Sequence, residues 1–196
     1  IVGSIYIVLG SVTLGLCFSL PIVLYLNLYL LEKSRLAQIT RLSFDVLFGI
    51  PSIVYGAFGF TLMVYLGLRS SLLAGILTVA ILIIPILIRS IDEVMRRVPK
   101  EMKDAALSLG ATKSEIIKPM LRQVVPGIIT AVLLAVGRGI GDAASVLFTA
   151  GYTDSIPTSL SQPVATLPLA IFFQLSSPIP EVQDRAYAAA LILTFI

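Results

Sequence analysis

Charge is scarce in this chain, and long stretches lack it completely. Only 13% of the 196 residues are charged, while 57% are hydrophobic; soluble domains carry about 25% charged residues. Residues 1–31, 46–68 and 70–88 contain no charge, and residues 123–153 contain only Arg138 and Asp142. Such a chain cannot cover its surface with polar groups, so lipid is the solvent that suits most of it.

Histidine is absent, and cysteine occurs once, at Cys17 within the first apolar stretch. These absences exclude a histidine-ligated zinc site, an imidazole base and a disulfide within the chain. We interpret Cys17 as a small apolar residue of a helix. The sequence also lacks a Walker motif, a catalytic triad and a metal-ligand cluster. We therefore predict a non-catalytic protein without a metal site.

The apolar stretches are continuous and long, which favours membrane-spanning helices. A helix needs about 20 apolar residues to cross the hydrocarbon core, and a β-barrel would show alternation instead. We predict an all-α, polytopic transmembrane helical bundle that forms one domain over 1–196. Its spans are expected near 3–31, 43–67, 70–90, 124–150 and 182–196. Because the chain starts without methionine and ends within an apolar run, we expect a fragment of a longer protein. If the N-terminus of the full protein is cytoplasmic, a further span is expected before Ile1, because the basic loops place Ile1 outside.

Lysine and arginine collect in two of the predicted loops. Residues 32–42 hold three of them and residues 89–122 hold eight, whereas the outer loop 151–181 holds none. Positive loops stay in the cytoplasm, so 32–42 and 91–122 are predicted to be cytoplasmic in a multi-pass protein of the cell membrane. The net charge of +3 suits anionic lipid headgroups and needs no nucleic-acid partner.

The cytoplasmic loop 91–122 has the pattern of two capped helices. Pro99 suits the start of a helix over 100–109, and Gly110 suits its left-handed end. Thr112 and Glu115 then form a capping box for a second helix. The loop is therefore predicted to be a rigid elbow that fits a cleft in a partner; a capped connecting helix without a partner is the alternative.

The elbow carries a family resemblance. Asp104-Ala105-Ala106, followed by Gly110, resembles the E-A-A-x-x-x-G loop of ABC importer permeases, with aspartate where glutamate is usual. This resemblance implies the MetI-like fold of binding-protein-dependent, type I importers. It also implies that Asp104, Ala105, Ala106, Gly110 and Ala111 dock a separate ATP-binding subunit. That partner would use the ATP, and the chain would bind no cofactor directly.

Three further segments resemble phosphate permeases. Residues 49–56 match the pattern G-[VI]-P-S-I-V-[FY]-G, residues 138–142 resemble R-x-x-G-[ED], and residues 157–168 resemble the outer loop of the PstA-type subunit. The resemblance implies a phosphate importer with a second permease of PstC type, two ATP-binding subunits and an extracytoplasmic phosphate-binding protein. A permease for another oxyanion, such as molybdate or sulfate, is the alternative, and an intramembrane enzyme is a third.

Arg138 and Asp142 are the charges placed deepest in the predicted spans. At i and i+4 they share a helix face, and charges at this depth face a bundle interior or a polar path. An arginine fork suits phosphate, so we predict that both line the translocation path and that passing phosphate loosens their ion pair. A purely structural ion pair is the alternative.

Small residues and one proline mark positions of close packing or bending. Gly137, Gly139 and Gly141 are expected to admit a neighbouring helix, or to let their own helix deform. Pro51 and Gly56 predict a bent helix, used either for packing against a partner subunit or as a hinge. Ser43 and Asp45 are expected to cap the start of this span, and a short helix is expected near 166–175.

Overall fold

The computed structural model describes residues 1–30, 34–153 and 155–196, and every regular element in these ranges is a helix. The predicted all-α fold is therefore confirmed. Lys33, one of the charges of the predicted loop 32–42, lies outside the described residues. The helices in these ranges are α1 (Val2–Leu28), α2 (Arg35–Phe48), α3 (Ser52–Tyr65), α4 (Leu72–Arg96), α5 (Lys100–Ser108), α6 (Lys113–Gly141), α7 (Leu167–Leu175) and α8 (Pro180–Phe195).

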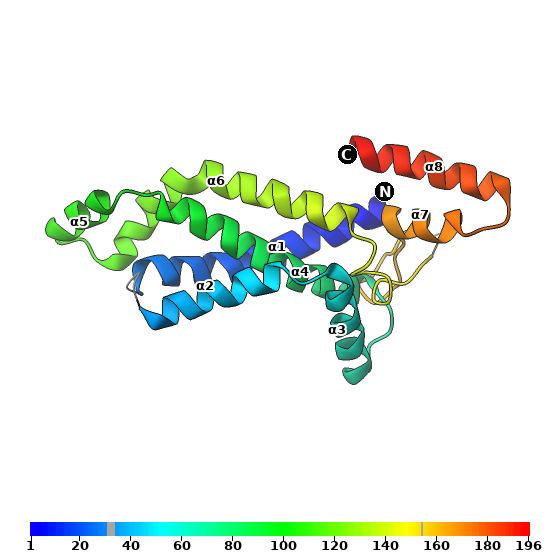
Figure 1. The fold of residues 1–196 in the computed structure, drawn as a ribbon, viewed down its shortest axis with the longest axis horizontal. Coiled ribbons are helices and arrows are strands. Elements are labelled where there is room, and N and C mark those ends of the chain that lie inside the picture. The colour runs from blue at the N-terminus through cyan, green and yellow to red at the C-terminus, as the bar shows by residue number, and fades with distance from the viewer. Residues whose placement is uncertain (31–33, 154) are drawn as a thin grey trace. The chain divides into compact units, whose positions relative to one another are not determined.

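The three longest helices, α1, α4 and α6, each contribute to two compact units (Figure 1). The first unit comprises residues 1–13, 50–83 and 136–196, and so includes α3, α7 and α8. The second comprises residues 14–49 and 84–135, and so includes α2 and α5. We describe each unit by itself.

In the first unit, small residues bring α1 and α4 together. The Ser11 hydroxyl donates to the backbone carbonyl of Ile76 across the helix pair, at 3.0 Å. One residue earlier, a Cβ atom at Gly10 would lie 2.7 Å from the Cδ1 atom of Ile76. Helices within a membrane pack through such small residues because these let the backbones approach closely. This unit is accordingly held by backbone proximity as well as by apolar side chains.

The segment after α6 is tied to the first unit by backbone hydrogen bonds. The amide of Leu72 donates to the carbonyl of Gln162 at 2.8 Å, and the amide of Leu167 donates to the Ser4 hydroxyl oxygen at 2.8 Å. Helix α7 agrees with the helix predicted near 166–175. Gln162 and Leu167 are thus held within the first unit.

In the second unit, an apolar stripe of α4 forms the centre of the core. Leu87, Ile91 and Met95 recur about once per turn and are completely buried. Gly127 of α6 lies directly against Val94 of α4, so these two helices also approach closely. Asp92 of α4 is also buried, and its hydrogen-bond partners come from α1 and α2.

The predicted span 43–67 is two helices in the structure. Helix α2 ends at Phe48 and α3 begins at Ser52, because proline at 51 cannot donate the backbone hydrogen bond that would continue α2. The predicted cap at Ser43 and Asp45 is wrong, because α2 already begins at Arg35. Both lie inside α2, whose first turn is capped instead by Ser34.

The predicted span 124–150 also has different ends. Helix α6 begins at Lys113 and ends at Gly141, and residues 144–150 form turns. Three glycines in its last five residues weaken the helix there, while Pro119 and Pro126 lie inside it without ending it.

By length and composition, α1, α4 and α6 are able to cross a membrane, and the bent pair α2 and α3 makes a fourth if it counts as one span. These are three or four candidates within the described ranges, where the sequence predicts four complete spans and one truncated span.

Candidate functional site

The predicted elbow is present and exposed. We call residues 99–112 the docking loop; it consists of Pro99, helix α5 and the turn that follows α5. No residue of α5 is buried, and Leu109 directly after it is 89% exposed. The predicted elbow is therefore an exposed segment of the second unit.

Gly110 makes the turn of the docking loop. Its φ of +85° lies in the left-handed region, which glycine enters without the steric penalty of a side chain. The amide of Ala111 donates back to the carbonyl of Ala106 at 3.1 Å, and this closes the end of α5. A Cβ atom added at Gly110 would meet no other atom of the chain within 4 Å. The outside of the turn is therefore free for close approach.

The second helix of the elbow starts as the sequence predicts. The backbone amide and the hydroxyl of Thr112 both donate to one carboxylate oxygen of Glu115, each at 2.7 Å. Helix α6 begins at the next residue, Lys113. The capping box thus fixes the direction in which α6 leaves the docking loop.

The remaining docking residues are accessible. Asp104 and Ala105 are exposed, and Ala106 and Ala111 are partly exposed. The loop rests on the end of α1, because Lys103 Nζ donates to the backbone carbonyl of Asn27 at 3.4 Å.

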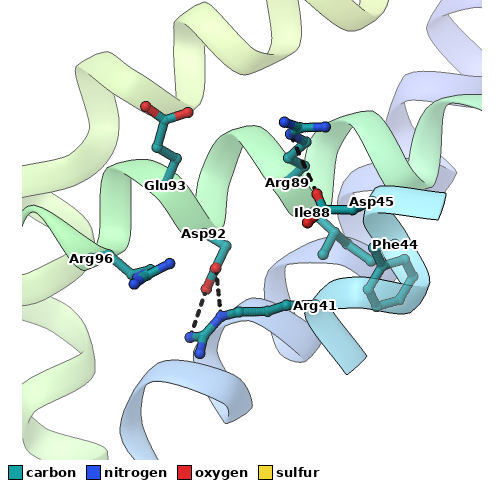
Figure 2. A pocket seen from close by; sticks show the side chains of 8 residues that line it. All are labelled: Arg41, Phe44, Asp45, Ile88, Arg89, Asp92, Glu93 and Arg96. Carbon is teal, nitrogen blue, oxygen red and sulfur yellow. Dashed lines mark hydrogen bonds and ion pairs between the residues drawn. The ribbon is translucent and has the colours of Figure 1, made fainter. Parts of the chain in front are cut away.

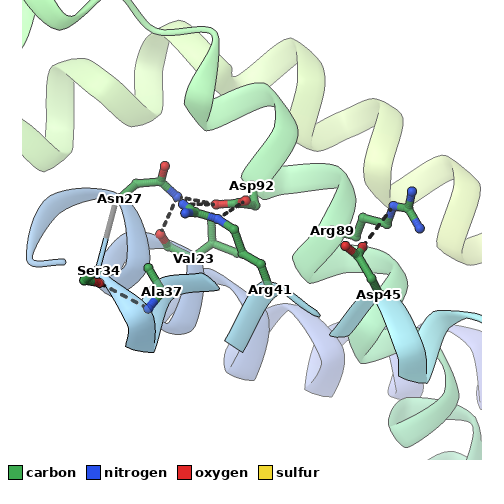
Figure 3. A network of polar contacts seen from close by, with 8 residues as sticks. All are labelled: Val23, Asn27, Ser34, Ala37, Arg41, Asp45, Arg89 and Asp92. Atoms are coloured by element: carbon green, nitrogen blue, oxygen red, sulfur yellow. Dashed lines mark hydrogen bonds and ion pairs between the residues drawn. The ribbon is translucent and has the colours of Figure 1, made fainter. Parts of the chain in front are cut away.

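The same end of α1 belongs to a buried polar network that the sequence analysis missed. Arg41 of α2 donates to Asp92 of α4 through Nε at 2.8 Å and through Nη2 at 3.2 Å (Figure 2). Asn27 of α1 donates to the same carboxylate at 2.7 Å and to the carbonyl of Val23 at 2.9 Å (Figure 3). The side chains of Arg41 and Asp92 are 17% and 9% exposed. One carboxylate thereby joins three helices.

One signal in the sequence could have found this network. Asp92 comes one turn after Arg89, at the end of a run of apolar residues, and an acid there needs a partner. Its partners are 65 and 51 residues away in the sequence, so only the fold identifies them.

Arg138 and Asp142 do not form the predicted ion pair. Helix α6 ends at Gly141, so Asp142 lies beyond the helix and no longer sits one turn above Arg138. Arg138 is exposed, whereas the Oδ2 atom of Asp142 is buried and has no hydrogen-bond partner in the described part of the chain. The Oγ atom of Ser145 is also buried and also has no hydrogen-bond partner in the described residues. The idea that phosphate loosens an existing pair therefore has no basis in this structure.

The predicted packing and hinge residues fall into two groups. A Cβ atom at Gly56 would lie 2.6 Å from the carbonyl oxygen of Ala144, and one at Gly139 would touch Val8 and Val79 at 3.4 Å. By contrast, Gly137 and Gly141 meet nothing within 4 Å, and Pro51 stands at the break between α2 and α3.

In the described ranges, no group of three or more cysteine, aspartate or glutamate side chains is placed to hold a metal ion.

Comparison with known proteins identifies the family. Residues 6–196 match the family model described as binding-protein-dependent transport system inner membrane component. The chain is 36% identical over 198 residues to the phosphate transport system permease protein PstA of Yersinia pestis, covering 99% of this chain and 66% of that protein. It is 35% identical to the protein of the same name from Haemophilus influenzae, covering 99% of this chain and 69% of that one. With PstA of Xylella fastidiosa (strain 9a5c) it shares 38% identity over 165 residues, which is 83% of this chain and 58% of that protein.

The chain therefore spans roughly two thirds or less of the length of most of these relatives. The match to the family model covers nearly all of the chain, and it agrees with the apolar helices of the fold. This chain belongs to the family of inner membrane components of binding-protein-dependent transport systems.

Proposed function

We propose that this chain is the transmembrane permease subunit of an ATP-driven phosphate importer. The observation that carries the proposal is the docking loop, which combines an exposed short helix with a left-handed glycine turn. The names of the relatives support phosphate as the substrate. A permease for another oxyanion, molybdate or sulfate, would share the docking loop and differ in what it carries.

In this proposal the chain performs no chemistry of its own. Separate ATP-binding subunits hydrolyse ATP and dock on Asp104, Ala105, Ala106, Gly110 and Ala111. The small side chains and the open outer side of the turn suit a close fit into a cleft of the partner. The complex further requires a second permease subunit, of PstC type, and an extracytoplasmic phosphate-binding protein.

Arg138 is the residue that we assign to the translocation path. It is exposed at the last turn of α6 and is not engaged by Asp142. A guanidinium without an ion-pair partner donates paired hydrogen bonds to a passing phosphate more readily than one that is already paired with a carboxylate. The carboxylate of Asp142 would repel a dianion, so in this proposal Asp142 faces away from the passing phosphate.

ATP-dependent uptake of radiolabelled phosphate into vesicles that contain the assembled importer tests the proposal. We expect Arg138→Gln to lower uptake at least about tenfold, as the loss of a charge-assisted contact would, while the complex still assembles. Gly110→Asp is expected to abolish copurification of the ATP-binding subunit, because it forces a charged side chain into the turn that docks.

Two results would overturn the proposal. If the vesicles take up molybdate or sulfate in preference to phosphate, the substrate is another oxyanion. If Gly110→Asp retains the ATP-binding subunit and full uptake, the docking assignment is wrong. Normal uptake by an assembled Arg138→Gln importer would limit Arg138 to a structural role.

A further inference from the structure

A second charged site lies in the second unit. A cavity of about 180 Å³ is lined by polar side chains of α2 and α4 (Figure 2). Three arginines and three acids line it: Arg41, Arg89, Arg96, Asp45, Asp92 and Glu93. The proposed transport function uses none of these residues.

The arginines come from both walls of the cavity. Arg89 and Arg96 are seven residues apart on α4, which places them two turns apart on one helix face. Arg41 approaches from α2 and is held in place by Asp92. Figure 2 shows Arg96 reaching toward this Arg41–Asp92 pair. Guanidinium groups thus enclose the cavity on more than one side.

The acids do not neutralise all of this positive charge. Asp92 is already matched by Arg41, and Glu93 pairs at 2.6 Å with Arg97, which lies outside the cavity lining. Asp45 lies 3.5 Å from Arg89, but both side chains are about half exposed, so this pair is weak.

Arg96 has neither an ion pair nor a hydrogen bond to any side chain in the described ranges. The three acids of the lining are matched by Arg41, Arg89 and Arg97. Among the described residues, the guanidinium of Arg96 is therefore the charge of the lining that has no opposite partner.

From this arrangement we infer that the cavity binds a phosphate group, held mainly by Arg96 and Arg89 with Arg41 as a fixed wall. Arginine forks match the oxygen geometry of phosphate. The α4 residues of the lining lie toward the predicted cytoplasmic loop 91–122, and Arg41 belongs to the predicted cytoplasmic loop 32–42. Anionic lipid headgroups and free phosphate are both available on that side. The inference does not depend on which solute the chain transports.

The phosphate group has two sources with the same chemistry. One is the headgroup of an anionic lipid, since the face of α2 opposite the cavity exposes Leu36, Ile39, Leu42 and Val46 and so lies against lipid. The other is inorganic phosphate on the cytoplasmic side. Because the arginines recognise the phosphate oxygens in either case, the experiment has one arm for each source.

The test uses the permease assembled with its ATP-binding subunits, without the binding protein, purified in detergent. In the first arm, equilibrium binding of radiolabelled inorganic phosphate is measured. In the second, native mass spectrometry measures retention of phosphatidylglycerol against diacylglycerol, which lacks the phosphate. We expect binding in at least one arm, and we expect Arg96→Gln to weaken it about tenfold, the effect of losing a charge-assisted contact.

Arg122→Gln is the matched control, because Arg122 is exposed on α6 and does not line the cavity. It removes the same charge and should leave binding unchanged. Arg96→Gln removes no ion pair and no side-chain hydrogen bond of the described residues, so assembly should be preserved, and size-exclusion chromatography verifies this. Loss of phosphate binding alone in Arg96→Gln assigns free phosphate, and loss of phosphatidylglycerol alone assigns a lipid.

The inference is overturned if the wild-type complex binds neither probe, or if Arg96→Gln binds as well as Arg122→Gln. Arg138 is intact in both variants. Either negative result therefore says nothing about the proposed transport function, which the uptake assay tests separately.

Discussion

Replacing Asp92 by alanine should destabilise the second unit more than any other single loss of a charge there. Its carboxylate accepts three hydrogen bonds, two from Arg41 and one from Asn27, at 2.7 to 3.2 Å. The replacement leaves the guanidinium of Arg41, whose side chain is 17% exposed, without its anion. Breaking a buried ion pair by removing one partner costs about 3–5 kcal/mol, so we expect the free energy of unfolding to fall by about that amount.

A second variant distinguishes the effect of the charges of Arg41 and Asp92 on stability from the effect of the volume that their side chains fill. Arg41→Met combined with Asp92→Leu removes both charges and keeps apolar bulk. Replacing a buried pair in this way is often neutral or stabilising, so the double variant should be more stable than Asp92→Ala alone. The difference isolates the cost of the stranded Arg41 charge.

Unfolding of the detergent-solubilised protein, followed by circular dichroism during titration with sodium dodecyl sulfate, measures these effects. Glu93→Ala is the control, since Glu93 and Arg97 form an exposed i,i+4 pair whose side chains are 65% and 73% exposed. Such pairs contribute only about 0.3–0.5 kcal/mol. The reasoning is refuted if Asp92→Ala costs no more than Glu93→Ala, or if the double variant is as unstable as Asp92→Ala.

Four further substitutions test the turn and the cap of the docking loop and the packing of one glycine in α3 and one in α6. Gly110→Ala should cost about 1 kcal/mol, because alanine resists the φ of +85° at this position; thermal unfolding and the amount of copurified ATPase measure it, and an unchanged melting temperature would contradict it. Thr112→Ala should cost about 1 kcal/mol, because it removes the hydroxyl that donates to the Glu115 carboxylate; hydrogen exchange should show earlier opening of the first turn of α6. Gly56→Ala should cost about 1–3 kcal/mol, since its Cβ would lie 2.6 Å from the Ala144 carbonyl oxygen. Gly137→Ala, which meets nothing within 4 Å, should be neutral or slightly stabilising; equal melting temperatures for these two variants would refute the packing argument.

The docking loop was predictable because its structure is determined locally. The capping box between Thr112 and Glu115 spans three residues, and the turn at Gly110 depends on the conformational freedom of one residue. Interactions of this kind form between neighbours in the sequence, so their pattern is visible before folding. The long helices were predictable for a similar reason, since each satisfies its own backbone polar groups within the membrane.

The ends of the spans were less predictable. A run of apolar residues shows that a segment suits lipid, but it does not show where a helix stops. Helix α2 ends at Phe48 although the apolar run continues, and α6 ends at Gly141 although the residues that follow are mostly apolar. This second difference removed the predicted pair of Arg138 and Asp142, because an i,i+4 pair requires a continuous helix.

By itself, the sequence determined that this protein is a bundle of membrane helices and that it carries an exposed elbow with a glycine turn. Both follow from solvent preference and from contacts within a few residues. Only the tertiary structure decided which charges meet. Asn27, Arg41 and Asp92 lie on three helices, and the cavity beside them takes its arginines from two. Pairing across helices depends on how their faces are turned toward one another, and that orientation results from the packing of the whole unit.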